Sequence, residues 1–70
     1  ENDNFMRLLI IATYFILLAF ELINTSIEKL SDKVQKDFDI DIKNIKDISS
    51  AAVFIILIIL ISLVFISILN

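Results

Sequence analysis

The residues best suited to chemistry lie in one stripe in the first half of the chain. A charge-free run over 8–20 is followed by Glu21, Asn24, Glu28 and Asp32. At about 100° per residue, these four side chains fall within roughly 80° of one helical face. Carboxylates in a segment apolar enough for a membrane are energetically expensive, so each is a candidate functional residue. We call this set the acidic stripe.

Glu21 is the deepest member of the acidic stripe, roughly two helical turns inside the polar end of its segment. Removal from water favours the protonated form of a carboxyl group, which suits a general base acting on a lipid hydroxyl. Asn24 could hold Glu21 or the nucleophile by a hydrogen bond. The alternatives are a Glu21 that reaches the interface, pairs with a lysine or stays protonated, and an Asn24 that makes a helix–helix contact.

Glu28 and Asp32 lie about one and two turns beyond Asn24, at the water boundary. Carboxylate oxygens there could bind Mg²⁺ that carries a nucleotide phosphate, with Glu28 as the metal ligand. The alternative is a solvated helix face paired with nearby lysines. Asp32 is treated as an ordinary acid of that face.

A second polar set follows in Lys43, Lys46, Asp47 and Ser50, which span roughly 100° of a helix. A lysine could neutralise phosphate charge, and Asp47 could assist at the nucleotide or metal. The alternative is a basic pair beside the membrane with a neighbouring acid. Ser50 could contact the substrate, although the small residues at 49–52 more simply allow close helix packing.

The composition indicates what must position these residues. Of the 70 residues, 59% are hydrophobic, and a soluble domain this small could not bury so much apolar side chain. Residues 5–27 and 48–69 are apolar segments long enough to cross a hydrocarbon core of about 30 Å. We therefore expect an all-α integral membrane hairpin, a single membrane domain over 1–70. Its helices are joined by a polar connector over 28–47, with a turn at 37–41.

The connector carries five of the six basic residues. The positive-inside rule places it in the cytoplasm, so both chain ends face the other side. The hairpin would bring the acidic stripe opposite the second polar set at the cytosolic boundary. That arrangement suits phosphoryl transfer to a lipid headgroup.

Several other classes of function are excluded. The chain has no cysteine and no histidine, and its net charge of −3 gives no support to nucleic-acid binding. Glycine is absent, which excludes a glycine-rich phosphate loop. A proton-carrying rotor hairpin is also disfavoured, because such hairpins are rich in glycine and carry their carboxylate on the second helix.

Two motifs resemble the small prokaryotic diacylglycerol kinase and undecaprenol kinase family. They are Glu21-x-x-Asn24-Thr25-x-Ile27-Glu28 and Lys46-Asp47-x-x-Ser50-Ala51-Ala52-Val53. The resemblance implies a homotrimeric, multi-pass enzyme of the bacterial inner membrane that acts in phospholipid metabolism. Members have three transmembrane helices and an amphipathic helix, and they use Mg²⁺ and ATP to phosphorylate a lipid hydroxyl.

The resemblance also implies residue roles. Glu21 would be the catalytic base and, with Ser50, contact the lipid substrate, and Asn24 would belong to the catalytic set. Glu28 would bind metal and nucleotide. The remaining nucleotide contacts would be Asp37, Phe38, Asp39, Lys46 and Asp47.

The chain departs from the family pattern in three ways. It lacks a histidine near Asp39 and small residues around Lys43 to Ile45, and it has no counterpart of the family's N-terminal helices. Because it begins at Glu1, we expect it to be the C-terminal two-thirds of such a kinase. The alternative is a truncated, non-catalytic hairpin with a role in assembly. Whether the lipid is diacylglycerol or undecaprenol is left open.

Overall fold

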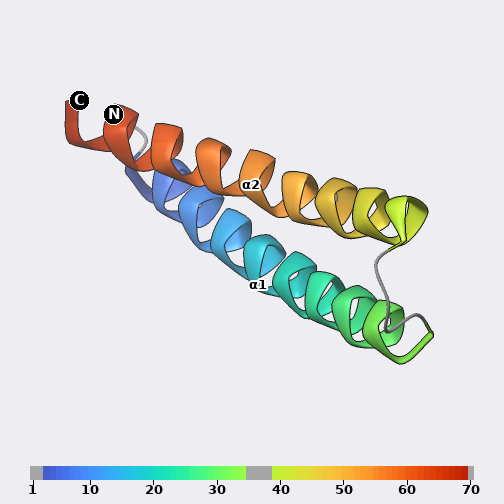
Figure 1. Cartoon of the computed structure of the whole chain (residues 1–70). Helices are drawn as coiled ribbons and strands as arrows, with labels where there is room; N and C mark the ends of the chain where they lie inside the picture. The colour runs from blue at the N-terminus through green and yellow to red at the C-terminus, as the bar shows by residue number, and fades with distance from the viewer. Residues whose placement is uncertain (1–2, 35–38, 70) are drawn as a thin grey trace.

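The protein is a hairpin of two long helices. The structure, a computed structural model, describes residues 3–34 and 39–69. Helix α1 spans Asp3–Val34 and helix α2 spans Ile40–Leu69, and they run antiparallel, so the start of α1 and the end of α2 lie together (Figure 1). The part of the chain that is described contains no strand. The expected all-α membrane hairpin is therefore confirmed as a fold.

Both helices are long and apolar enough to cross a membrane. The hairpin is 54 Å long, which exceeds a hydrocarbon core of about 30 Å. Among the described residues, Leu17 is the one buried apolar side chain, while large apolar side chains are exposed along both helices. A hairpin this thin has no interior for its apolar groups, and a lipid environment accommodates them.

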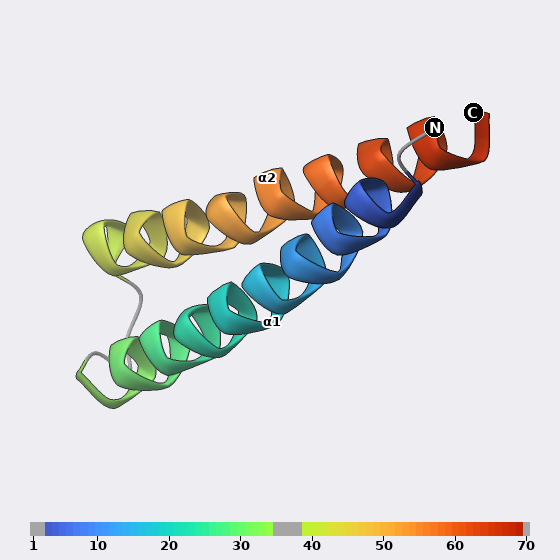
Figure 2. The same ribbon diagram turned by 180° about the vertical axis from the view of Figure 1, so that it is seen from behind.

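The two helices face each other along stripes in which the less exposed positions recur every three or four residues, as expected for one face of a helix. On α1 the stripe consists of residues 6, 9, 10, 13, 17, 24, 27, 28 and 31, and on α2 of residues 42, 46, 49, 52, 53, 56, 60 and 63. The separation between the ribbons widens toward the connector (Figures 1 and 2). Polar contacts between the helices lie in this wider half, where side chains must reach further.

Asp39 starts helix α2. Its Oδ1 accepts hydrogen bonds from the backbone N–H groups of Asp41 at 2.9 Å and Ile42 at 3.1 Å, which is the geometry of a helix N-cap. Its carbonyl accepts from the N–H of Lys43 at 2.9 Å. The helix thus begins at Ile40, inside the segment expected to form the turn, and α1 ends at Val34.

Loss of this cap gives a stability prediction. Asp39→Ala should lower the free energy of unfolding by about 1 kcal/mol, because two N–H groups lose their acceptor, whereas Asp39→Asn should retain most of it. Unfolding of the protein in detergent micelles, followed by circular dichroism, measures the difference. Asp41→Asn, a change at the neighbouring exposed acid, is the control. Equal stability of Asp39→Ala and wild type would contradict the capping role.

Candidate functional site

Glu21 lies on α1 directly after the apolar run. Its side chain is exposed and makes no hydrogen bond or ion pair with any other residue that the structure describes. On the helical wheel it lies about 60° from Asn24, at the edge of the face toward α2. The Glu21 side chain is therefore open to a group that approaches this edge of the helix.

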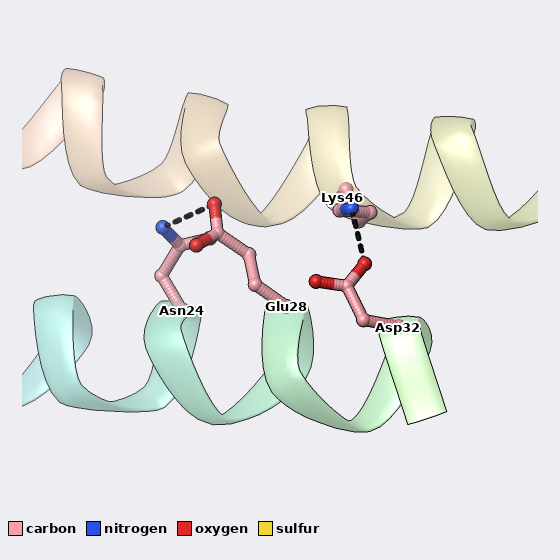
Figure 3. Close-up of polar contacts among 4 residues, drawn as sticks. All are labelled: Asn24, Glu28, Asp32 and Lys46. Carbon is pink, nitrogen blue, oxygen red and sulfur yellow. Dashed lines mark hydrogen bonds and ion pairs between the residues drawn. The ribbon is translucent and has the colours of Figure 1, made fainter. Parts of the chain in front are cut away.

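Asn24 joins the two helices. Its Oδ1 accepts a hydrogen bond from the hydroxyl of Ser49 on α2, and its Nδ2 donates to Oε2 of Glu28 at 3.5 Å (Figure 3). Asn24 therefore makes the expected helix–helix contact, and it makes no hydrogen bond to Glu21 within the described residues.

Glu28 points from α1 toward α2 and is half-buried (Figure 3). No group of three or more acidic, histidine or cysteine side chains able to hold a metal occurs in 3–34 or 39–69. A single carboxylate such as that of Glu28 is a kind of ligand that Mg²⁺ takes together with waters and substrate phosphates.

Lys46 crosses from α2 to Asp32 on α1, with 2.8 Å between Nζ and Oδ1 (Figure 3). This hydrogen bond raises the pKa of Lys46 above its ordinary value of 10.5, and the negative charge of Glu28 acts in the same direction. The amine is therefore protonated at neutral pH and lies within electrostatic reach of both carboxylates. Asp32, treated from the sequence as an ordinary helix-face acid, is the partner of the lysine at this site.

Asp47 and Ser50 lie on another side of α2. The carboxylate of Asp47 pairs with Lys43 on its own helix, with 2.6 Å between Nζ and Oδ2, and the side chains of Asp47 and Ser50 are exposed. Consecutive helical residues differ by about 100° in direction, so Lys46 and Asp47 cannot both face α1. The structure brings Lys46, but not Asp47 or Ser50, toward the acidic stripe.

The connector residues expected to contact the nucleotide are only partly described. Asp37 and Phe38 lie outside the described residues. Asp39 is described, and its Oδ1 is committed to the cap of α2.

Comparison with known protein families assigns almost the whole chain. Residues 1–69 match the family described as prokaryotic diacylglycerol kinase. The chain belongs to the prokaryotic diacylglycerol kinase family. No curated protein and no solved structure matches it. Membership in this kinase family agrees with two membrane-length helices and a polar end that carries both acids and lysines.

In this diacylglycerol kinase family member, two contacts between the helices were not predicted from the sequence: that of Asp32 with Lys46 and that of Ser49 with Asn24. Asp32 shares a helical face with Glu28, but its pairing depends on how α2 is rotated and aligned against α1. Ser49 stands beside Ser50, and only the rotation of α2 shows which of the two faces α1. The ion pair of Lys43 with Asp47 has a signal in the sequence, because residues four apart on a helix bring their side chains together.

Proposed function

We propose that the protein is a lipid kinase that transfers the γ-phosphoryl group of ATP to the hydroxyl of a membrane lipid, either diacylglycerol or undecaprenol. The observation that carries this proposal is the order of groups along one helical face. Glu21 lies nearest the apolar run, Glu28 lies two turns closer to the polar end, and the cation of Lys46 reaches across from α2 beyond it.

Each residue has one task in the proposed reaction. The carboxylate of Glu21 accepts the proton of the lipid hydroxyl while the oxygen of that hydroxyl bonds to the γ-phosphorus. The bond from the γ-phosphorus to the bridging oxygen breaks, and ADP leaves with the electron pair. Lys46 neutralises phosphate charge, and Glu28 binds the metal of the nucleotide. Mg²⁺, when bound, stabilises the charge that develops on the phosphate oxygens.

The remaining roles are further parts of the proposal. Asn24 belongs to the catalytic set through its contact with Glu28. Asp37, Phe38, Asp39 and Asp47 contact the nucleotide, and Ser50 contacts the lipid. Asp47 would leave its ion pair with Lys43 when it contacts the nucleotide. That ion pair lies at the surface, and surface ion pairs are weak.

The proposed setting is the bacterial inner membrane, with a multi-pass chain and the connector over 28–47 in the cytoplasm. The lysines of the connector support this orientation. A homotrimer is proposed because the family resemblance implies it, and the exposed apolar surface of both helices leaves room for neighbouring subunits as well as lipid.

The deciding experiment is a lipid kinase assay of the full-length protein in lipid vesicles. ATP labelled at the γ-phosphate and Mg²⁺ are supplied with diacylglycerol or with undecaprenol as the acceptor. We expect label in one lipid phosphate product, whose identity names the acceptor, and no transfer when the metal is chelated. A folded, membrane-inserted protein that labels neither lipid would contradict the proposal and favour a non-catalytic hairpin.

A further inference from the structure

Ser49 uses its hydroxyl differently from two other serines in the membrane helices. Ser26 donates to the carbonyl of Leu22 at 3.0 Å and Ser62 to the carbonyl of Ile58 at 2.8 Å. These are the usual bonds of a helical serine to the carbonyl four residues earlier. Ser49 instead donates to Oδ1 of Asn24, on the other helix. Its proton therefore links α2 to the acidic stripe of α1.

The hydrogen bond of Ser49 is the first of two in series. Asn24 accepts from Ser49 at one end of its amide and donates to Oε2 of Glu28 at the other. Rotation of the amide by 180° would place Oδ1 against the carboxylate of Glu28, and two acceptors cannot bond to each other. The amide therefore has one orientation in which both of its ends are bonded.

Glu28 alone would hold this amide weakly. The distance from Nδ2 to Oε2 is 3.5 Å, beyond the usual range of 2.7–3.2 Å for such a bond. The stronger anchor of Asn24 is therefore its contact with Ser49. Apolar contacts between the helices have no comparable direction, so they align the helices without orienting an amide.

We propose that Ser49 is a positioning residue, which orients the amide of Asn24 so that its N–H group faces one carboxylate oxygen of Glu28. The other oxygen, Oε1, is then left to face the metal-bound nucleotide. The consequence for nucleotide binding rests on the proposed function, whereas the orientation of Asn24 does not. Ser49 acts only through Asn24 and does not contact the substrates.

Three variants of the full-length protein test this role. Ser49→Ala removes the hydroxyl, Ser49→Thr restores one, and Ser62→Ala is the matched control, because among the described residues Ser62 bonds within its own helix. Loss of one interhelical hydrogen bond in a membrane protein corresponds to about a threefold to tenfold change in an equilibrium constant. Ser49→Ala should therefore raise the KM for Mg·ATP about threefold to tenfold, while the KM for the lipid is unchanged.

Whether a variant changes KM or kcat distinguishes a positioning role of Ser49 from a general structural role. A variant that merely folds less well would contain less active protein, which lowers the apparent kcat and leaves both KM values unchanged. Ser49→Thr should return the KM for Mg·ATP toward wild type, and Ser62→Ala should not change it. A KM for Mg·ATP that is unaffected by Ser49→Ala, or raised equally by Ser62→Ala, would overturn the proposed role.

A second measurement does not need catalysis. The side-chain amide of Asn24, labelled with ¹⁵N in micelles, should shift in the nuclear magnetic resonance spectrum of Ser49→Ala and return in Ser49→Thr. If wild type phosphorylates no lipid, the proposed function fails while this spectrum still decides the orientation of Asn24. An amide signal that is identical in wild type and Ser49→Ala would overturn the inference even in an active kinase.

Discussion

Replacement of Glu21 by glutamine is expected to abolish ATP-dependent lipid phosphorylation while the hairpin stays folded. Glutamine keeps the size of the side chain but cannot accept the hydroxyl proton, and loss of a general base lowers a rate by about 10²–10⁴-fold. The fold should survive because Glu21 is exposed and makes no polar contact with another described residue. The lipid kinase assay measures the loss, and circular dichroism measures the retained helix.

Two further variants control this result. Asp41→Asn removes a carboxylate in the first turn of α2, away from the acidic stripe, and should leave the rate near that of wild type. Glu21→Asp keeps the base but shortens its reach, so part of the activity should remain. Undiminished turnover in Glu21→Gln would show that the base lies elsewhere.

The second large effect is expected for Glu28→Gln. A neutral amide is a poor ligand for Mg²⁺, so kcat/KM for Mg·ATP should fall about 100-fold, equivalent to roughly 2.7 kcal/mol of transition-state stabilisation. The side-chain oxygen of glutamine can still accept a hydrogen bond from Asn24, so the free energy of unfolding of the hairpin should equal that of wild type. Activity measured over a range of Mg²⁺ concentrations should show a higher requirement for the metal.

Comparison of the two glutamine variants separates their roles. Glu21→Gln should bind Mg·ATP with the wild-type dissociation constant and fail at turnover. Glu28→Gln should bind Mg·ATP weakly. Equilibrium binding of a non-hydrolysable Mg·ATP analogue distinguishes them without any chemical step. Equal nucleotide binding by both variants would contradict the assignment of Glu28 as the metal ligand.

The helices of this protein were predictable from its sequence because their signal is local. Two long apolar segments without glycine or proline leave the backbone one way to satisfy its hydrogen bonds in lipid. The start of α2 was nearly as predictable from the sequence, because aspartate commonly caps helices and Asp39 does so here.

The partners of the polar side chains were not predictable in the same way. Whether Lys46 meets Asp32 or Glu28 depends on the register between two helices, and a shift of one turn moves a residue about 5.4 Å along the axis. The apolar residues of both segments would pack in several registers. The rotation of α2, which turns Ser49 and Lys46 toward α1 and leaves Asp47 beside Lys43, likewise follows from tertiary packing.

The unbroken course of α1 has a consequence for which alcohols the proposed kinase could use. Glu21 and Glu28 are on one rigid rod, about 10.5 Å apart along its axis, and neither glycine nor proline lies between them. The helix therefore fixes the depth of Glu21 in the membrane relative to Glu28. A hydroxyl carried by an acyl or prenyl chain is held at the level of Glu21 by its own anchor, whereas a water-soluble alcohol has no reason to stay there. The proposed kinase would then select acceptors first by the depth at which the membrane holds their hydroxyl group, before any other group on the acceptor is recognised.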